Sequence, residues 1–331
     1  MSWFEDLTGF RETSPEQVRS NLALDGETLT SSVNGRVMVC GRLETPALSE
    51  LRERVRPGER GGGGISVREA VANVQALHAD PANAGALFQV ASQFNLLEMA
   101  SPSATPEQGV GIYENDPTQG PACAVAAGAG TIYRNYFVPV NGQIGQSAGN
   151  QIDCLADLGV ALGNTGNRLW QMRNGYALAS RDGLLEIAER LRDSSESELD
   201  ELRGLLRIGI QWDTQVTLPG CTHRVSQAYC SALPVAYSSH PAHLWESFAR
   251  LVLEAAYEAT LCAAVLNRLS SGNRHAFLTL LGGGAFGNQP EWIMDALRRA
   301  LVLYADWGLD VAIVSYRSPN PGVQQLVEQF P

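Results

Sequence analysis

The sequence predicts an α/β fold in which helices cover a layered sheet. In the C-terminal third, short apolar runs alternate with amphipathic stretches, as strands and helices do when they pack in layers. The chain of 331 residues, with 44% hydrophobic and 18% charged residues, is long enough to bury a sizeable core in one large domain or two smaller ones. Because ligands of such sheets bind at the carboxyl ends of strands, the segments that follow strands are the candidate sites.

The N-terminal part has a looser pattern. Its expected elements are, in order, a strand over 36–42, a short helix after Pro46, a flexible glycine-rich connector over 58–64, and a buried strand over 85–91. Between the last two, Ser66 and Glu69 form a capping-box pattern. That pattern predicts a helix from Ser66 to about Asp80.

A long irregular stretch, residues 95–117, follows the 85–91 strand and precedes a helix of small residues over 120–133. A loop of this length inside a compact domain is usually functional or disordered. Beyond it the sequence predicts, in order, helices over 182–192 and 196–206, strands over 207–218 and 224–237, a helix over 242–269, a strand over 276–281, a helix over 290–305, a strand over 309–316 and a helix over 321–329.

The charge balance excludes several classes of partner. The net charge is −11, with 24 Lys plus Arg and no basic runs, which argues against nucleic acid and against an anionic membrane surface. The chain has no apolar run of membrane-spanning length and no signal-peptide pattern at its start. The six cysteines are scattered, without a CxxC pair or metal-type spacing, so we expect buried free thiols, no metal site and a cytoplasmic protein.

Residues 278–292, LTLLGGGAFGNQPEW, read as a strand that runs into a glycine-rich turn and then a helix. Backbone N–H groups at such a junction are unpaired and the helix dipole favours negative charge, so the turn suits a phosphate. Gly282, Gly283 and Gly284 have no Cβ, which lets a ligand approach the main chain. The segment matches neither of the two commonest nucleotide motifs, and a tight strand-to-helix turn explains it equally well.

Polar side chains gather where the 85–91 strand ends. Ser92, Gln93 and Asn95 are short groups that can hydrogen-bond sugar hydroxyls without adding charge. The alternative is a polar turn in which Asn95 caps the next element.

Four carboxylates follow in the long loop: Glu98, Glu107, Glu114 and Asp116. In one interpretation Asp116 caps the helix that starts near Gly120, and the glutamates are ordinary exposed groups. In the other, the clustered acids form an acid/base site. Crowded like charges raise the pKa of one carboxyl and so supply a proton donor.

The order of these motifs resembles the macrodomain fold. A strand, VASQFN, a long loop and a small-residue helix come first, followed much later by strand–LLGGGAFGNQP–helix and strand–SY–helix. The details look most similar to the divergent MavL-like macrodomains, which remove ADP-ribose from arginine. The matching segments are GALFQVASQFNLLEM, YENDPTQGPACAVAAGAGTIYRNYF, YCSALPVAYS and LGGGAFGN. The resemblance implies a three-layer α/β/α sandwich with a mixed central sheet over 66–331, with residues 1–65 as an N-terminal extension packed on the core.

The resemblance also implies ligand contacts. In the family, an asparagine after the first strand contacts the ribose near the scissile bond, a place that Asn95 occupies here, with Gln93 beside it. The family's second glycine loop wraps the diphosphate of ADP-ribose. Its counterparts here are Gly283, Gly284, Ala285, Phe286, Gly287 and Asn288, with Phe286 as the aromatic beside the ribose. Gln89, Asp153 and Arg317 are unranked candidates for contacts with adenine.

Catalytic residues follow from the MavL-like class, in which acids of the long loop do the chemistry. Asp116 is the clearest match, Glu107 and Glu98 are its expected partners, and Glu114 competes with them. Ordinary macrodomains carry a glycine triplet directly after the first asparagine. Here Leu-Leu-Glu-Met stands there instead, so the ordinary scheme of water activation is not implied.

The expected reaction is hydrolysis of the bond between ADP-ribose and a modified arginine of a protein. Such cleavage passes through an oxocarbenium-like centre, which carboxylates stabilise and a carboxylate-activated water attacks. No cofactor is expected, only ADP-ribose as ligand and product. A non-catalytic reader of ADP-ribose and a hydrolase of a small ADP-ribose derivative are the alternative interpretations.

Overall fold

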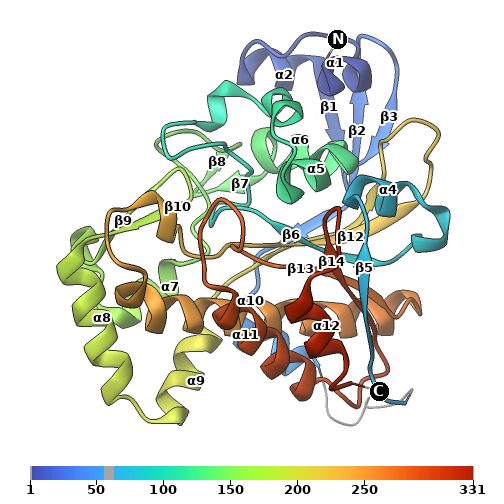
Figure 1. The fold of residues 1–331 in the computed structure, drawn as a ribbon. Helices are drawn as coiled ribbons and strands as arrows, with labels where there is room; N and C mark the ends of the chain where they lie inside the picture. Colours follow the sequence, from blue (N-terminus) through green and yellow to red (C-terminus); the bar gives the residue numbers. More distant parts are fainter. Residues whose placement is uncertain (1, 56–62, 331) are drawn as a thin grey trace.

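A mixed seven-stranded sheet runs through the molecule in the order β4–β11–β12–β6–β13–β14–β5 (Figure 1). The computed structural model describes residues 2–55 and 63–330. Five adjacent strands run parallel: β12 (Arg224–Cys230), β6 (Leu87–Ala91), β13 (His275–Thr279), β14 (Asp310–Ser315) and β5 (Ser66–Val71). At one edge β11 (Gly209–Gln215) pairs antiparallel with β12, and β4 (Arg42–Glu44) pairs antiparallel with β11. The predicted mixed central sheet is confirmed.

Helices cover both faces of this sheet, which confirms the three-layer α/β/α arrangement (Figure 1). One face carries α4 (Val74–Ala79), α5 (Gln119–Ala126) and α6 (Gly128–Tyr136). On the other face the long α10 (Ala242–Ser271) packs against α3 (Leu48–Arg54), α8 (Arg181–Asp193), α9 (Glu196–Gly204) and α11 (Pro290–Leu303), and α12 (Pro321–Val327) packs beside α11. None of the helices in the described part of the chain is long and apolar enough to cross a membrane.

Residues 2–40 form a small N-terminal unit of their own beside α5 and α6. It consists of α1 (Trp3–Thr8), α2 (Pro15–Asn21) and a three-stranded sheet of β1 (Leu22–Asp25), β2 (Thr28–Ser31) and β3 (Val37–Val39). Its apolar side chains, such as Phe4 and Val18, share a second hydrophobic core with residues of the long loop and of α6, such as Tyr113 and Ile132. We call this second core the N-terminal core.

Residues 42–55 belong instead to the main body, because β4 joins the central sheet and α3 packs on α10. The prediction of one strand over 36–42 was therefore wrong. The chain turns at Gly41, whose φ is +71° and where a Cβ would meet the carbonyl oxygen of Trp212, so β3 and β4 lie in different sheets. The short helix after Pro46 is confirmed as α3. Residues 58–62 of the predicted connector lie outside the described residues.

The capping-box interpretation of Ser66 and Glu69 was wrong. Residues 66–71 form the edge strand β5, paired in parallel with β14, and the helix α4 begins only at Val74 with Asn73 as its cap. The pattern SVREAV also suits a strand that is half exposed, and hydrogen bonding to β14 decides between the two.

The predicted helix over 120–133 is two helices. The chain leaves the helical conformation at Ala127, and a Cβ on the next residue, Gly128, would lie 2.6 Å from the Trp3 side chain, so the N-terminal unit packs into the break. The strand predicted over 224–237 ends at Cys230, where its pairing with β6 ends. The other predicted helices and strands are confirmed within a few residues.

The remaining elements are short. They are α7 (Ala156–Leu162), the hairpins β7 (Pro139–Val140) with β8 (Gln143–Ile144) and β9 (Trp170–Arg173) with β10 (Tyr176–Ala179), and the 3-10 turns η2 (Pro81–Asn83), η3 (Pro106–Gln108), η4 (Gly111–Asn115), η5 (Thr165–Asn167) and η6 (Val235–Tyr237). All six cysteines are free thiols and five of them are buried, as the sequence predicts.

Candidate functional site

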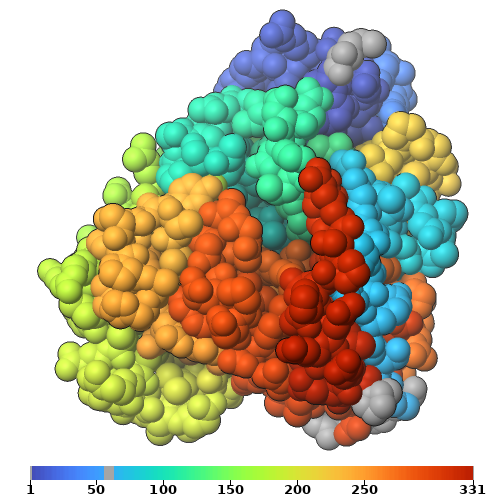
Figure 2. Space-filling model, viewed as in Figure 1, coloured from blue at the N-terminus to red at the C-terminus, as the bar shows by residue number. Residues whose placement is uncertain are grey.

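A pocket opens where the carboxyl ends of β6 and β13 lie side by side. The chain leaves β6 towards α5 on one face of the sheet and leaves β13 towards α11 on the other (Figure 1). Such a change of side separates the two connections and leaves a crevice, which is the usual ligand site of open α/β sheets. Figure 2 shows the recess between the green segment around residues 115–125 and the orange and red segments of the C-terminal third.

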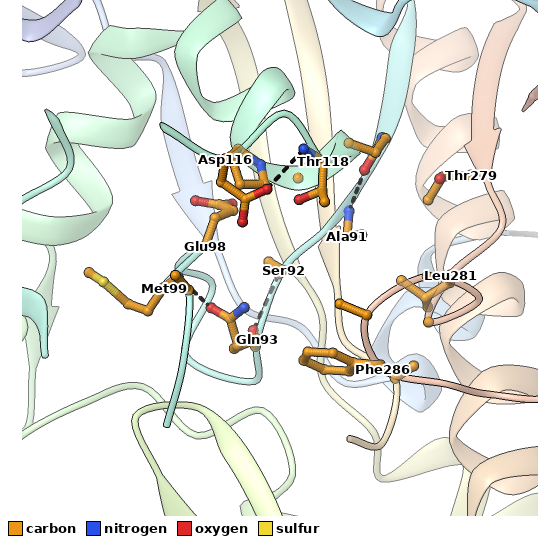
Figure 3. A pocket seen from close by; sticks show the side chains of 18 of the residues that line it. Ala91, Ser92, Gln93, Glu98, Met99, Asp116, Thr118, Thr279, Leu281 and Phe286 are labelled. Atoms are coloured by element: carbon orange, nitrogen blue, oxygen red, sulfur yellow. Dashed lines mark hydrogen bonds between the residues drawn. The ribbon is translucent and has the colours of Figure 1, made fainter. Parts of the chain in front are cut away.

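Glu98 lines this pocket and is almost completely buried, with 3% of the residue exposed (Figure 3). Its carboxylate pairs with Arg134, whose Nη2 lies 3.3 Å from both oxygens. Its backbone N–H donates to the Tyr113 hydroxyl at 3.2 Å. Burial raises the pKa of the Glu98 carboxyl to about 7, although the guanidinium of Arg134 opposes this shift. Glu98 is therefore a group that can both donate and accept a proton near neutral pH.

Arg134, on α6, is a fully buried arginine that the sequence analysis did not single out. Its Nε donates to the carbonyl of Leu96 at 3.0 Å, its Nη1 donates to the Tyr229 hydroxyl, and its Cζ lies 3.7 Å from the centre of the Tyr229 ring. Tyr229 in turn donates to Gln227 at 2.5 Å. These contacts hold the Arg134 guanidinium in place beside the Glu98 carboxyl.

Asp116, the second carboxylate of the pocket, ends the turn η4 (Figure 3). One of its oxygens accepts the backbone N–H of Thr118 at 2.9 Å. Thr118 is the N-cap of α5 and makes no capping hydrogen bond with its side chain. The carboxylate thus closes a tight turn before the helix, and the prediction that it caps the helix itself was wrong. The structure brings Glu98 and Asp116 together in one pocket.

The other two acids of the loop lie elsewhere. Glu107 is exposed and accepts the backbone N–H of Ala148 at 2.8 Å, away from the residues that line the pocket. Glu114 accepts the backbone N–H of Trp3 at 3.0 Å and lines the adjacent cavity described below. The structure does not bring Glu107 to the pair formed by Glu98 and Asp116.

Gln93 and Asn95, the two predicted sugar contacts, are placed differently. Gln93 lines the pocket, and its oxygen accepts the backbone N–H of Met99 at 2.8 Å (Figure 3). Its amide nitrogen has no hydrogen-bond partner among the described residues, so it can donate into the pocket. Asn95 is fully buried outside the lining, where its side chain bonds Leu97 and Gln151.

The glycine-rich loop forms the opposite wall. Within the described part of the chain, the backbone N–H groups of Gly282, Gly284, Ala285 and Phe286 have no hydrogen-bond partner, whereas those of Gly283 and Gly287 bond back within the loop. Asn288 is buried and ties the loop together by donating to the carbonyls of Leu233 and Gly282. Gly283 faces a neighbouring cavity instead of this pocket. The helix α11 begins only at Pro290, so the loop, and not the helix terminus, presents the free donors.

The charge of the pocket wall is consistent with a site in which backbone N–H groups bind an anion. None of the described residues that line the pocket is Lys or Arg. Across from the loop, α5 begins, and the backbone N–H groups of Gln119 and Gly120 also have no partner in the described structure. An anion in the pocket would therefore be held by amides, with carboxylates at its side.

Three aromatic rings meet at one end of the pocket. Phe286 lies 5.3 Å from Tyr176 and 5.5 Å from Tyr237 between ring centres, and the two tyrosines are 5.0 Å apart. Tyr176 donates to the carbonyl of Met99 at 2.7 Å and comes from the hairpin β9–β10. No local pattern in the sequence points to Tyr176, because the hairpin reaches the pocket only through the tertiary fold.

A second cavity adjoins the first, and Asp116, Thr118, Gln119 and Thr279 line both. Its other wall comes from the segments after β5 and β14, with Asn73, Gln75, Tyr316 and Arg317. Of the candidate adenine contacts, Arg317 therefore lies at a cavity. Gln89 bonds Thr260 and Thr279 inside the core, and Asp153 lines neither cavity.

No protein-family model matches the chain, and no curated protein matches it in sequence. Solved structures are similar to it over nearly its whole length. Poly(ADP-ribose) glycohydrolase from Deinococcus radiodurans in complex with ADP-ribose is 12% identical, with 97% of this chain and 98% of that chain covered and a TM-score of 0.45.

The poly(ADP-ribose) glycohydrolase from Thermomonospora curvata is 13% identical, with 96% of each chain covered and a TM-score of 0.45. The same glycohydrolase bound to the inhibitor ADP-HPD is 14% identical, with 96% of each chain covered and a TM-score of 0.44. At these identities and TM-scores the similarity concerns only the overall arrangement of the chain.

Proposed function

We propose that this protein is a hydrolase that binds ADP-ribose and releases it from modified arginine residues of proteins. One observation carries the proposal. Two carboxylates of a single loop line the same pocket as a glycine loop with unpaired backbone donors, and one of them, Glu98, has a pKa near neutral. Backbone donors suit a diphosphate, and a carboxyl with a pKa near neutral beside a second carboxylate suits acid/base chemistry.

The ligand would extend across both cavities. The unpaired amides of the glycine loop and of the α5 N-terminus face each other across the first pocket and would hold the diphosphate. The ribose to be released would lie towards Phe286, where the Gln93 amide and both carboxylates are within the same lining. The adenosine would occupy the second cavity beside Tyr316, whose exposed ring can stack on a base.

Hydrolysis would need three proton transfers, of which the last restores the acid form of Glu98. The bond between C1″ of the ribose and the guanidinium nitrogen breaks, and its electron pair leaves with the nitrogen. Protonated Glu98 gives its proton to the departing guanidine. Water then attacks C1″ and gives a proton to the Asp116 carboxylate, which returns it to Glu98. The products are ADP-ribose with a free C1″ hydroxyl and an arginine guanidinium.

The pocket's chemistry favours arginine as the modified side chain. A guanidinium pairs with carboxylates and stacks on aromatic faces, and both Asp116 and the rings of Tyr176, Tyr237 and Phe286 line the pocket. A carboxylate-linked substrate would place its acid beside these carboxylates, where none of the described lining residues is a cation that could offset it.

The experiment that tests the proposal uses peptides mono-ADP-ribosylated on Arg, Glu or Ser. We expect the wild-type protein to release ADP-ribose from the Arg peptide. Asp116→Asn should lower the release rate about 10²-fold, the scale of general acid–base catalysis, and keep the affinity for ADP-ribose in calorimetry. Asp25→Asn, which removes an exposed carboxylate of β1, is the matched control and should behave as wild type.

The outcomes separate the alternatives. ADP-ribose binding without release from any peptide would mean a reader and would rule out the hydrolase. Release from small ADP-ribosyl guanidines, with no release from the Arg peptide, would mean a hydrolase of a small derivative. Glu107→Gln tests the third predicted acid, whose part in the reaction stays a prediction.

The glycine loop allows a test of binding alone. Gly282 has a φ of +74°, and a Cβ on it would lie 2.4 Å from Ala232. We expect Gly282→Ala to shift the loop amides and weaken ADP-ribose binding at least about tenfold, a loss of about 1.4 kcal/mol. The control is Gly272→Ala, at the end of α10, where φ is +77° but a Cβ meets nothing within 4 Å. It shares the backbone strain, so equal affinity in both variants would contradict the assignment of the loop.

A further inference from the structure

The loop that carries both carboxylates has little structure of its own. Between Glu98 and Asp116 the described chain forms only the two 3-10 turns η3 and η4. Short 3-10 turns have poor hydrogen-bond geometry and are not stable by themselves. Contacts from other parts of the chain must therefore hold this loop in place.

Glu12, in the N-terminal unit, supplies the main contact. One of its oxygens accepts the backbone N–H of Val110 at 3.0 Å and the other accepts that of Gly111 at 2.7 Å. The Tyr136 hydroxyl, from α6, donates to the first oxygen at 2.5 Å. A carboxylate that accepts two adjacent backbone donors and a hydroxyl is fixed in position, and charge-assisted bonds of this kind are the stronger ones.

The loop is shaped around this carboxylate. A Cβ on Gly109, whose φ is +86°, would lie 2.4 Å from a Glu12 oxygen, and a Cβ on Gly111 would lie 2.8 Å from the same atom. The first helix adds two bonds, from the Trp3 backbone N–H to Glu114 at 3.0 Å and from the Trp3 indole to the Val110 carbonyl at 3.3 Å. The N-terminal unit thus holds η4 from several sides.

Tyr113, in the turn η4, holds the backbone of both carboxylate residues, Glu98 and Asp116. The Tyr113 hydroxyl accepts the backbone N–H of Glu98, and its carbonyl accepts that of Asp116 at 3.1 Å. Tyr113 is 2% exposed and packs in the N-terminal core, so it cannot move without disturbing that core.

We propose that Glu12 is a positioning residue of the active site and that the N-terminal unit completes the catalytic loop. The inference rests on the proposed hydrolase function and adds a residue that touches no substrate. A shift of the loop by about 1 Å is enough to lower a catalytic rate about 10²-fold. The glycine loop, which would hold the diphosphate, is not among the hydrogen-bond partners of Glu12 in the described structure and would keep its place.

The experiment compares Glu12→Gln with Glu16→Gln in the full chain. Glu16 is an exposed glutamate of α2 whose partner, Arg19, is also at the surface, so it is the matched control. For Glu12→Gln we expect kcat for the Arg peptide to fall at least about tenfold while the Kd for ADP-ribose changes less than about threefold. Hydrogen exchange of the Val110 and Gly111 amides should be faster than in wild type, because their acceptor loses its charge.

Gly111→Ala keeps the inference testable if Glu12→Gln does not fold. It pushes on the same contact from the side of the loop and should reduce kcat in the same way without weakening ADP-ribose binding. Wild-type turnover in both folded variants would overturn the positioning role and leave the hydrolase standing. Absence of turnover in wild type and in Glu16→Gln alike would instead overturn the proposed function, and the role of Glu12 in catalysis with it.

Discussion

Glu98→Gln is expected to lower the release of ADP-ribose from the Arg peptide by about 10³-fold or more. The substitution removes the proton donor and keeps the size of the side chain, so the loss belongs to the chemistry. In wild type the acid form of Glu98 disappears as pH rises through about 7, and kcat should fall on that alkaline side. The variant should lack this limb of the profile.

The same residue ties stability to pH. In the folded protein the pKa of Glu98 is raised from 4.5 to about 7, so the native state holds more protons than the unfolded state between these values. Its contribution to stability is therefore complete below about pH 4.5 and lost as pH rises to 7, a change on the order of 3 kcal/mol. Glu98→Gln should flatten the pH dependence of the unfolding free energy by that amount. If Glu98→Gln keeps wild-type turnover and the wild-type pH dependence of the unfolding free energy, both roles of Glu98 are contradicted.

Arg134→Met is expected to cause the largest loss of stability. It leaves the Glu98 carboxylate buried without its partner, and breaking a buried ion pair in this way costs about 3–5 kcal/mol. The loss should be greater at pH 8 than at pH 5, because Glu98 escapes the penalty by binding a proton. Urea unfolding at the two pH values measures it.

Two variants make this test specific. Arg168→Met breaks an ion pair with Glu186 in which both side chains are about half exposed, and it should lose at most about 1 kcal/mol. The double variant Arg134→Met, Glu98→Gln should recover part of the lost unfolding free energy, because it leaves no buried carboxylate without a partner. If Arg134→Met lowers the free energy of unfolding no more than Arg168→Met does, the buried ion pair does not make the expected contribution to stability.

Three central strands of the sheet could be predicted because they are mostly apolar. The expected strands over 85–91, 276–281 and 309–316 became β6, β13 and β14, which are buried on both faces. The edge strand β5 mixes polar and apolar residues, and its Ser66 and Glu69 also have the spacing of a helix capping box. Pairing with β14 makes this segment a strand, and a pattern over a few residues does not show that pairing.

The pocket lining was predictable where it depends on local sequence. The acids Glu98 and Asp116 lie in the loop after β6, and part of the glycine loop after β13 lines the same pocket. Asn95 lies two residues beyond Gln93, and the turn between them buries one amide and exposes the other to the pocket. No side-chain pattern reveals which of the two faces the pocket.

Arg134 was missed although the sequence holds a signal for it. It is the only charged residue between Asp116 and Asp153. A lone arginine in a stretch of small and apolar residues is expected to be buried, and a buried arginine needs an acid. Which acid it meets depends on how α6 packs against the long loop, and that is a property of the tertiary fold.

The N-terminal core has a consequence for how heat inactivates the protein. It is separate from the large core around α10, and it includes Leu97, Met99, Val110 and Tyr113 of the long loop. Separate small cores open as cooperative units at a lower free-energy cost than the whole domain. Turnover should therefore disappear at a temperature where the sheet, the glycine loop and ADP-ribose binding still persist. The loop's amides would exchange with solvent first and those of β6 and β13 last.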